Sequence, residues 1–339
     1  MNFNINKNKL FLIAEIGVNH NGNYSFAIKL IDSAKRAGFD AVKFQTFIPE
    51  QMTHSKTKLA EYQKKTKFKN MQLMLKKYNF SHEQFYELKK YCDKSKIIFL
   101  STPFDLDSAI FLNKINVKAF KISSGDLDNF YLLSEVKKFK KPIIISTGMA
   151  NNEEIKKTIN FLKLPKSKLA VLHCISDYPT EIKNTFFSNF NFLKKFKYTV
   201  GFSDHTLGSV SSSIAVALGS TFIEKHITLD NKMNGPDHAC SMQVSELESF
   251  VKTLRDVRTS ITFPRILTSS EKNTVKVARK SLYYAKNLEK NSSIEFKDLI
   301  PLRPASNDIS PKFYKFFLGK KIKHSVKKNT PVKISDIVK

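Results

Sequence analysis

Residues 198–227 read YTVGFSDHTLGSVSSSIAVALGSTFIEKHI, and this stretch sets the pattern for most of the chain. Two short apolar runs, 198–204 and 221–227, flank the segment 208–218, whose apolar residues have helical spacing. A strand, a helix and a second strand in this order form the repeating unit of parallel α/β folds. The stretch therefore predicts a parallel sheet that is covered by helices.

Polar side chains occupy the ends of both strands. Ser203 and His205 lie two residues apart, as do Glu224 and His226, so each pair shares one face of its strand. Parallel strands end at the same edge of a sheet, which brings the two pairs close together. Two imidazoles, a carboxylate and a hydroxyl in one place indicate a metal-assisted active site.

The same unit recurs along the chain. Strands are expected at 11–18, 40–47, 97–104, 119–124, 142–148, 169–174, 198–204 and 221–227, and helices at 24–37, 81–94, 106–115, 130–139, 152–163, 186–196, 208–218 and 245–259. Eight strand–helix pairs in succession favour a (β/α)₈ TIM barrel, with a doubly wound open sheet as the structural alternative. The long, polar, Lys-rich insertion 48–80 is expected over the active site, because insertions between strand and helix usually lie there.

The helical pattern breaks near residues 260–280, where Pro264 and a run of hydroxyl residues occur. Beyond it the chain has short apolar runs, several prolines and no strong helix. We expect 1–262 to form the barrel, 263–280 a linker, and 281–339 a small, mostly β C-terminal domain.

The charge is strongly positive, with 57 Lys+Arg against 30 Asp+Glu and a formal net charge of +27. Only six of the basic residues are Arg, and no basic cluster is interleaved with stacking aromatic residues. Base recognition favours the flat guanidinium group, so we expect no nucleic-acid partner. A Lys-rich surface would still attract anionic substrates.

The cysteines indicate the compartment. Cys92, Cys174 and Cys240 are far apart, odd in number and without a Cys-x-x-Cys motif, which favours reduced thiols in a cytoplasmic protein. The first apolar stretch, 10–18, is short and contains Glu15, so we expect neither a signal peptide nor a membrane span there, and no other stretch approaches membrane length. We therefore expect no membrane contact.

Further polar residues gather at the ends of the expected strands. They are Glu15, Lys43, Gln45, Thr102, Lys121, Ser123, Ser124, Ser146, His173, Ser176 and Tyr178. Buried Lys43 and Lys121 would need an anion as partner, and hydroxyls with Ser-Gly turns suit a phosphate or carboxylate. This array predicts a pocket for a small, multiply charged anion. Two histidines without a third evident protein ligand suit Mn²⁺ or Mg²⁺ completed by water and substrate oxygens.

Several motifs point to one family. They are AEIGVNHNG (14–22), VKFQTF (42–47), STPFD (101–105), STGMA (146–150), GFSDHT (201–206), EKHITLD (224–230) and GPDH (235–238). In these motifs and their order, the chain resembles the sialic acid synthases, the bacterial N-acetylneuraminate synthase family, over essentially its whole length.

The resemblance implies a barrel followed by an antifreeze-like (SAF) β domain, usually in a domain-swapped homodimer. It implies that phosphoenolpyruvate condenses with open-chain N-acetylmannosamine to a nine-carbon 2-keto sugar acid, with phosphate released by C–O cleavage. The nearest alternative is an N,N'-diacetyllegionaminate synthase that uses 2,4-diacetamido-2,4,6-trideoxymannose. A Schiff-base aldolase using Lys43 or Lys121 is more distant, because it leaves the paired histidines without a role.

The resemblance also implies roles for single residues. Glu15 and Glu224 would act as acid and base, and His205 and His226 would hold the metal. Phosphoenolpyruvate would be bound by Lys43, Thr102, Lys121, Ser124, Ser146, Ser176 and Ser203, and the sugar by Gln45, Tyr178, Asp237 and a partner's residue equivalent to Arg303. Two points stay open. Face parity favours Ser123 over Ser124, and Ala305 stands where relatives usually have a glycine that follows Arg303 and Pro304.

Overall fold

The computed structural model describes residues 3, 5, 9–304 and 309–338. The chain divides into two compact units, Met1–Phe263 and Pro264–Lys339. The first contains a parallel barrel, and the second contains a small antiparallel sheet.

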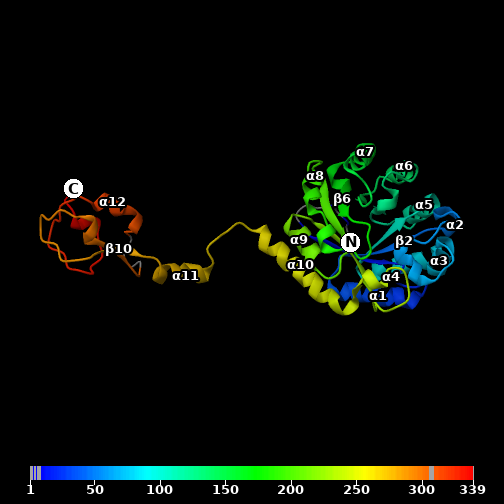
Figure 1. Ribbon diagram of the computed structural model, residues 1–339, viewed down its shortest axis with the longest axis horizontal. Coiled ribbons are helices and arrows are strands. Elements are labelled where there is room, and N and C mark those ends of the chain that lie inside the picture. Colours follow the sequence, from blue (N-terminus) through cyan, green and yellow to red (C-terminus); the bar gives the residue numbers. More distant parts are fainter. Residues whose placement is uncertain (1–2, 4, 6–8, 305–308, 339) are drawn as a thin grey trace. The chain divides into compact units, whose positions relative to one another are not determined.

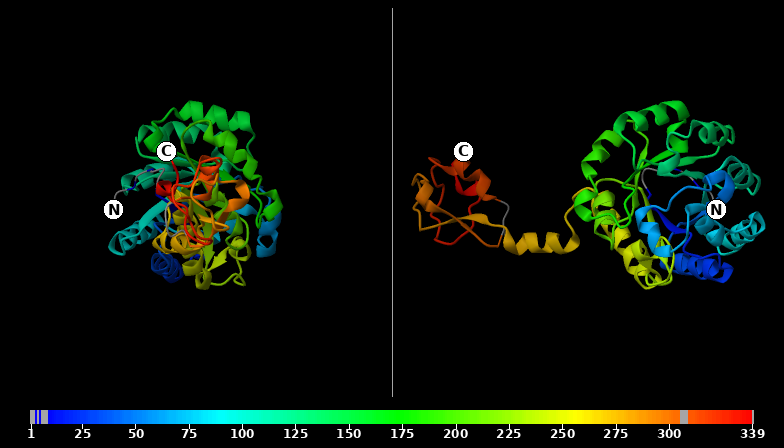
Figure 2. Two further views of the ribbon diagram at one scale, coloured as in Figure 1. Left: turned by 90° about the vertical axis from the view of Figure 1, so that its left-hand side faces the viewer. Right: turned by 45° about the vertical axis from the view of Figure 1, so that its right-hand side comes forward.

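Eight parallel strands form the barrel, and helices surround them (Figures 1 and 2). The strands are β1 (Phe11–Gly17), β2 (Ala41–Thr46), β3 (Ile98–Pro103), β4 (Phe120–Ile122), β5 (Ile143–Ser146), β6 (Leu169–Cys174), β7 (Thr199–Asp204) and β8 (Phe222–Thr228). Hydrogen-bonded ladders join them in the order β3-β2-β1-β8-β7-β6-β5-β4. β3 and β4, at the two ends of this order, lie side by side, so the barrel nearly closes. The predicted barrel is confirmed, and the open sheet is excluded.

Each expected helix is present in the barrel unit. The helices that follow the strands are α1 (Tyr24–Ala37), α4 (His82–Lys94), α5 (Leu106–Lys114), α6 (Phe130–Lys138), α7 (Asn152–Leu162), α8 (Phe190–Lys194), α9 (Val210–Ala217) and α10 (Leu247–Thr262). Local sequence sets their ends. The side chain of Asn23 accepts hydrogen bonds from the backbone N–H groups of Ser25 and Phe26 at the start of α1. The helix stops at Gly38, whose φ of 91° favours glycine.

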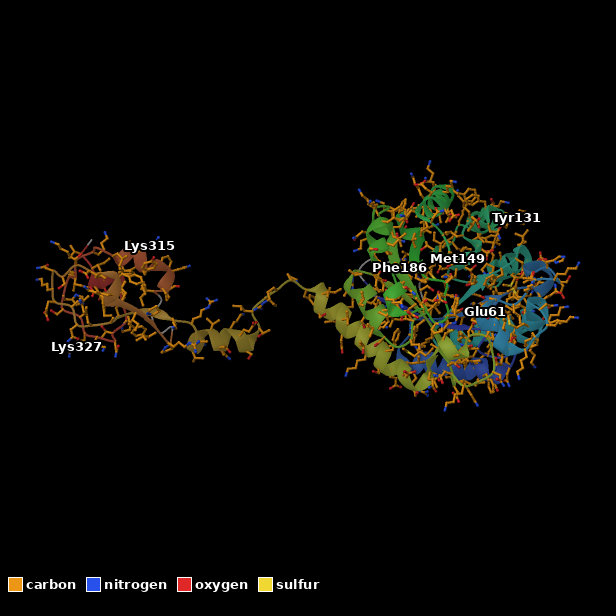
Figure 3. The ribbon with its side chains drawn as sticks, viewed as in Figure 1. Glu61, Tyr131, Met149, Phe186, Lys315 and Lys327 are labelled. Atoms are coloured by element: carbon orange, nitrogen blue, oxygen red, sulfur yellow. The ribbon has the colours of Figure 1, made fainter. Side chains whose placement is uncertain are left out.

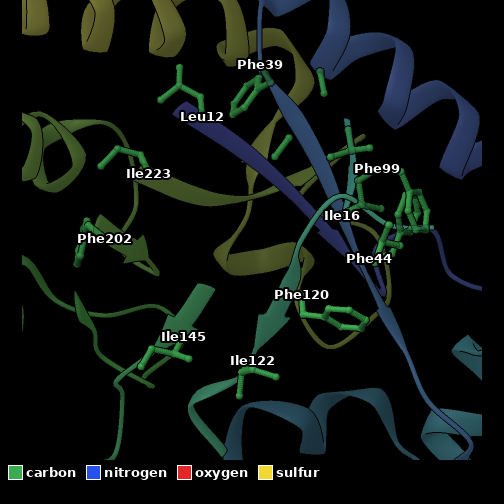
Figure 4. Packing of buried hydrophobic residues seen from close by; sticks show 14 of the residues in the cluster. Leu12, Ile16, Phe39, Phe44, Phe99, Phe120, Ile122, Ile145, Phe202 and Ile223 are labelled. Atoms are coloured by element: carbon green, nitrogen blue, oxygen red, sulfur yellow. The ribbon is translucent and has the colours of Figure 1, made fainter. Parts of the chain in front are cut away.

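The outer core lies between the strands and the helices. Every second strand residue points outward into this layer, including Leu12, Ala14 and Ile16 of β1. Figure 4 shows part of this cluster, in which the rings of Phe44 and Phe99 stack with centroids 5.5 Å apart. These contacts fix the direction in which the alternate residues point, which is toward the barrel axis.

Inside the barrel, apolar residues fill one layer and polar residues the next. Ile13, Ala41, Leu100, Ala119, Ile144, Leu172 and Phe222 form the inner apolar cluster. Each stands two positions before a buried residue at its strand's end, namely Glu15, Lys43, Thr102, Lys121, Ser146, Cys174 and Glu224. Because side chains alternate along a strand, the apolar layer forms the floor of the polar one.

The insertion between β2 and α4 has its own structure. It contains α2 (Pro49–Met52), the 3₁₀ helix η1 (Glu61–Thr66) and α3 (Met71–Tyr78). Met74, Leu75 and Tyr78 pack with Val18 and Phe47 in a separate buried cluster. A further short strand, β9 (Met242–Gln243), pairs with β8 beyond the barrel.

The C-terminal unit begins inside the segment predicted as a linker. This segment contains α11 (Ser269–Ala278), which corrects the expectation that the helical pattern is broken there. The side chain of Thr268 accepts a hydrogen bond from the N–H of Glu271, and this capping box starts the helix. β10 (Ser281–Tyr284) pairs antiparallel with β11 (Leu299–Leu302), and α12 (Tyr314–Phe317) follows. This small sheet fits the antifreeze-like domain that the resemblance implies.

The structure bears on the expectations about reduced cysteines and about membrane-spanning segments. All three cysteines lie within the described residues, and none takes part in a disulfide. In the described part of the chain, no helix combines the length and the apolar character that crossing a bilayer requires.

Gly201 of β7 allows close packing between β6 and β8, and its replacement tests this packing. A Cβ atom there would lie 2.2 Å from Cδ2 of Leu172 and 2.7 Å from the carbonyl oxygen of Phe222. We expect Gly201→Ala to lower the free energy of unfolding by about 1–3 kcal/mol, because overpacking forces the backbone to shift. Gly125→Ala is the control, since its nearest neighbour would lie 3.8 Å away. Equal urea-unfolding curves for the two variants would contradict this packing.

Candidate active site

A cavity of about 580 Å³ is lined by residues at the C-terminal ends of the barrel strands. Fourteen of the fifteen predicted site residues line it, namely Glu15, Lys43, Gln45, Thr102, Lys121, Ser124, Ser146, Ser176, Tyr178, Ser203, His205, Glu224, His226 and Asp237. Loops contribute further lining residues, among them Glu61 and Met149, which Figure 3 labels. The fifteenth, Arg303, follows β11 in the C-terminal unit, so its contact with the sugar stays a prediction. Ala305 lies outside the described residues.

Four charged side chains meet at the centre of the cavity. Lys43 Nζ lies 2.7 Å from Glu15 Oε2 and 3.8 Å from Glu224 Oε1. Lys121 Nζ lies 3.5 Å from the same Glu224 oxygen. All four side chains are at least nine-tenths buried, so each charge has lost most of its water. We call Glu15, Lys43, Lys121 and Glu224 the charge cluster.

Hydroxyl groups complete the coordination of the charge cluster. Lys43 Nζ donates a hydrogen bond of 3.0 Å to Thr102 Oγ1, and Lys121 Nζ donates one of 2.7 Å to Ser146 Oγ. Ser203 donates to Glu224 Oε1 at 3.0 Å. Each hydroxyl comes from a different strand, so the barrel itself holds the cluster in place.

The two carboxyl groups differ in protonation. Burial raises the pKa of Glu15 to about 7, although the neighbouring ammonium of Lys43 opposes this rise. Burial also acts to raise the pKa of Glu224, but Lys121 and Lys43 together outweigh it, so this pKa is lower than usual. Near neutral pH the site therefore contains one carboxyl group that can hold a proton and one that is ionised.

The pKa values of the two lysines are also shifted in opposite directions. Burial lowers the pKa of Lys121, and the attraction of Glu224 offsets this only in part. For Lys43, burial acts to lower the pKa, but Glu15 and Glu224 outweigh it, so its pKa is raised. Lys43 is thus the more firmly protonated of the two.

Two serine hydroxyls pack closely against Gly148. The backbone N–H of Gly148 donates to Ser124 Oγ at 3.0 Å. A Cβ atom on Gly148 would lie 2.3 Å from Ser176 Oγ and 2.8 Å from Ser124 Oγ, so only glycine lets both hydroxyls come this close to the backbone. Ser124 and Ser176 both line the cavity, and neighbouring hydroxyls suit the oxygens of a phosphate.

The choice between Ser123 and Ser124 depends on where β4 ends. The strand stops at Ile122, and a 3₁₀ helix, η2 (Ser124–Asp126), follows, so strand parity no longer applies. Ser123 donates to the carboxylate of Asp126 at 2.7 Å, whereas Ser124 faces Gly148. This geometry favours Ser124, which is the residue that the resemblance implies.

The two histidines lie side by side with ring centroids 5.6 Å apart. His205 Nδ1 lies 2.6 Å from the carbonyl oxygen of Ile175, so Nδ1 carries the proton and Nε2 keeps its lone pair. His226 Nδ1 is buried and has no hydrogen-bond partner among the described residues. Burial, followed by His205 and Lys43, holds the pKa of His226 well below its usual range, so its ring is neutral.

The donor set at the histidines is sparse. Within the described part of the chain, no group of three or more His, Cys, Asp or Glu side chains gathers as a metal site. Asp237 Oδ2 lies 4.0 Å from His226 Nδ1. Burial acts to lower the pKa of His205, but Cys174 and the carbonyl oxygen of Ile175 outweigh it, so this pKa is raised. The two imidazoles fit a cation whose other ligands are water and substrate oxygens, and at His205 such a cation would compete with a proton.

The insertion supplies the outer wall of the cavity, as predicted. Tyr62 of η1 stacks on Tyr178 with centroids 4.9 Å apart, and Tyr178 packs on His205 at 4.1 Å. The insertion also contributes the polar residues Glu61 and Gln63 to the lining. The apolar residues around them are Val18, Met52, Ala60, Met71, Met74, Leu75, Tyr78 and Phe104. Opposite this wall, Gln45 Nε2 donates to Glu15 Oε1 at 3.2 Å. The cavity thus has a charged inner end and a mainly apolar outer side.

His173, one of the polar residues at the expected strand ends, does not line the cavity, whereas Cys174 and Tyr62 line it and are not among the predicted residues. His173 faces the outer layer, where its ring stacks on Phe202 and Nε2 lies 2.6 Å from the carbonyl oxygen of Thr185. Its neighbour Cys174 points inward and lies 3.9 Å from His205 Nδ1. The two-residue step from Leu172 of the inner layer could have identified Cys174. Tyr62 had no such signal, because it lies in the insertion.

Comparisons with known proteins agree with this geometry. The sequence profile of the NeuB family matches residues 30–264. N,N'-diacetyllegionaminic acid synthase of Campylobacter jejuni is 40% identical over 319 residues, which cover 92% of this chain and 95% of that protein. The Legionella pneumophila protein of the same name is 35% identical over 329 residues, covering 94% and 92%.

A solved structure extends the comparison to three dimensions. The N-acetylneuraminic acid (sialic acid) synthetase of Leptospira borgpetersenii superposes with a TM-score of 0.72 at 30% identity, covering 81% of this chain and 96% of that one. These matches confirm the resemblance that the motifs indicate, and the chain belongs to the NeuB family.

Proposed function

We propose that the protein condenses phosphoenolpyruvate with an open-chain N-acylated amino sugar and releases phosphate. The product would be a nine-carbon 2-keto sugar acid. The observation that carries this proposal is the charge cluster, which presents two buried ammonium groups beside two imidazoles in one cavity. Membership of the NeuB family supports the same reaction class.

Phosphoenolpyruvate would bind at the inner end of the cavity. Its carboxylate and phosphate would pair with Lys43 and Lys121, which now pair with Glu15 and Glu224. Thr102, Ser146 and Ser203 would then turn their hydroxyls to the same anion, and Ser124 and Ser176 would hold phosphate oxygens beside Gly148. The ligand thus replaces carboxylate partners that the lysines already have.

A divalent cation, Mn²⁺ or Mg²⁺, fits the pair His205 and His226. The support is the unpartnered Nδ1 of His226 and the orientation of His205, whose Nδ1 faces the carbonyl oxygen of Ile175 and leaves Nε2 for a cation. When bound there, such a cation would act as a Lewis acid toward the carbonyl oxygen of the sugar. Tyr178, whose ring packs on His205, would limit the directions from which the sugar approaches.

The two carboxyl groups would divide the proton transfers. C3 of phosphoenolpyruvate bonds to the aldehyde carbon, and Glu15 would donate the proton that the new hydroxyl oxygen needs. Water then adds at C2, and Glu224 would accept its proton at Oε2, which has no hydrogen-bond partner among the described residues. The C2–O bond to phosphate then breaks as the new C2 hydroxyl gives up its proton to the leaving phosphate, which leaves the 2-keto acid and inorganic phosphate.

The outer wall favours one acceptor over another. 2,4-Diacetamido-2,4,6-trideoxymannose carries a methyl group at C6 and an acetamido group at C4, where N-acetylmannosamine has hydroxyls. Hydroxyls buried against Met52, Met71, Met74 and Leu75 would lose hydrogen bonds to water without replacement. The motifs place N-acetylneuraminate first, but this wall and two relatives named for legionaminic acid lead us to propose the diacetamido sugar.

A Schiff-base aldolase stays as the second candidate because of one observation. Burial lowers the pKa of Lys121, and a neutral amine is what a Schiff base requires. The hydrogen bond from Lys121 to Ser146 and its pairing with Glu224 instead suit an ammonium that binds an anion. This pairing makes the aldolase the weaker candidate.

We also propose, from the resemblance alone, a domain-swapped homodimer in which the partner's residue equivalent to Arg303 contacts the N-acyl group. Arg303 itself lies in the C-terminal unit next to β11. The proposed reactants are small soluble molecules, and a cytoplasmic enzyme would meet both.

The direct test supplies metal-stripped protein with phosphoenolpyruvate and either acceptor, with and without Mn²⁺. We expect phosphate and a nonulosonate to appear together, only with Mn²⁺, and at least about 10-fold faster with the diacetamido sugar, the discrimination of roughly one extra apolar contact. A faster reaction with N-acetylmannosamine would restore N-acetylneuraminate as the product.

His226→Ala should nearly abolish turnover. Borohydride added with a keto substrate should leave Lys121 unmodified, and its trapping would favour the aldolase.

The proton held by Glu15 should appear in the dependence of stability on pH. Its pKa rises from 4.5 to about 7 on folding, so the folded state keeps this proton where the unfolded chain loses it. The stability that the proton provides is complete below pH 4.5 and is lost as the pH rises through 7.

Glu15→Gln removes this titration. The free energy of unfolding of the wild type should therefore fall relative to the variant between pH 5 and pH 7, by at most about 1.4 kcal/mol per pH unit. Urea unfolding at pH 5 and at pH 7 measures this difference in free energy. Glu61→Gln, which changes an exposed carboxylate, is the control. A constant difference between wild type and Glu15→Gln would show that Glu15 is ionised throughout.

A further inference from the structure

We propose that Asp204 and Lys225 are positioning residues, which hold His205 and His226 at the separation that a divalent cation requires. This inference rests on the cation proposed above for the two histidines. Asp204 directly precedes His205, and Lys225 directly precedes His226. Neither side chain lines the cavity in the described structure, so neither is needed for contact with a substrate.

The two residues face each other across β7 and β8. Asp204 and Lys225 are register partners in this parallel ladder, the last pair that it contains. Their side chains are 0% and 2% exposed, and Lys225 Nζ lies 3.0 Å from Asp204 Oδ2. Because residues alternate along a strand, this pair points into the outer layer while the histidines point into the cavity.

The carboxylate of Asp204 also accepts hydrogen bonds from Thr206, the residue after His205, and from helix α9. Its Oδ1 accepts hydrogen bonds of 2.8 Å from the backbone N–H and from the hydroxyl of Thr206. Its Oδ2 accepts one from Ser212 of α9, at 2.5 Å, in addition to Lys225. Lys225 in turn donates to the carbonyl oxygen of Thr206. The backbone at 204–206 is thus bonded to α9 and, through Lys225, to β8.

Stability alone does not explain why this ion pair is buried between β7 and α9. A buried ion pair is weak support for stability, since apolar residues of the same size often serve as well. The hydrogen bonds of this pair instead fix the register of β7 against β8 and the conformation of the turn after β7. A shift of one residue between β7 and β8 would move either histidine to the opposite face. On its other edge, β8 pairs with β1, in which Glu15 is the register partner of His226.

The test measures Mn²⁺ binding to metal-stripped protein by electron paramagnetic resonance. Asp204→Asn combined with Lys225→Met removes both charges and leaves neither unpaired. We expect the dissociation constant for Mn²⁺ to rise by about 10–100-fold, the usual effect of altering groups that orient metal ligands. The absorption spectrum of bound Co²⁺ should also change, because it reports ligand geometry, which a purely structural role would leave unaltered.

Thr158→Val is the matched control. Thr158 is fully buried and donates to the carbonyl oxygen of Leu127, in a different part of the barrel. Its replacement should lower stability but leave the Mn²⁺ dissociation constant within about 2-fold of the wild type, since no bond near the histidines is lost. This separates loss of stability from loss of position.

The outcomes separate this inference from the proposed function. Wild-type Mn²⁺ affinity in the double variant would overturn the positioning role and leave the proposed reaction intact. Failure of the wild type to bind any divalent cation would overturn both. If the double variant does not fold, Ser212→Ala removes one bond to Asp204 and should weaken Mn²⁺ binding in the same direction. Unchanged affinity in that variant would count against the inference.

Discussion

Two ammonium groups buried near the centre of the barrel set the constraint on which the rest of this structure depends. Removing Lys43 and Lys121 from water costs several kcal/mol for each ion unless opposite charges and hydrogen bonds replace the water. Glu15, Glu224 and hydroxyls from three strands provide this replacement. In the proposed reaction the same arrangement would prepare the site for phosphoenolpyruvate, because an incoming anion would replace one set of negative partners by another and meet groups already in position.

The alternation of side chains along the strands explains why the charges can be placed so deeply. Outward residues such as Leu12 and Ile16 bury the strands under the helices, and this fixes the inward direction of the others. The inward residues form an apolar layer and, two positions later, the polar layer of the active site. Each functional side chain therefore stands on a packed floor, and its position is determined by the barrel more than by its own loop.

Much of this could be predicted from the sequence, because strand ends and side-chain parity follow from short-range pattern. All eight strands were placed, and the polar residues at their ends do line one cavity. Where strand geometry stops, prediction became weaker. His173 stands among the polar residues at the expected strand ends, but the parity of β6 turns Cys174 inward instead. The contact of Tyr62 with Tyr178 joins distant segments, which no periodic pattern can reveal. Helix α11 does not follow from the apolar pattern, because none of its residues is buried, and only the capping box of Thr268 and Glu271 indicates it in the sequence.

The proposed function requires that Lys121 and Lys43 exchange their carboxylate partners for phosphoenolpyruvate. Calorimetric titration of phosphoenolpyruvate into the wild type and into Lys121→Met measures this exchange directly. Lys141→Met serves as the control, since Lys141 is a half-buried lysine that does not line the cavity. We predict that the dissociation constant rises by about 10–100-fold in Lys121→Met alone, as expected for the loss of one charged hydrogen bond. An unchanged dissociation constant in Lys121→Met would contradict the account.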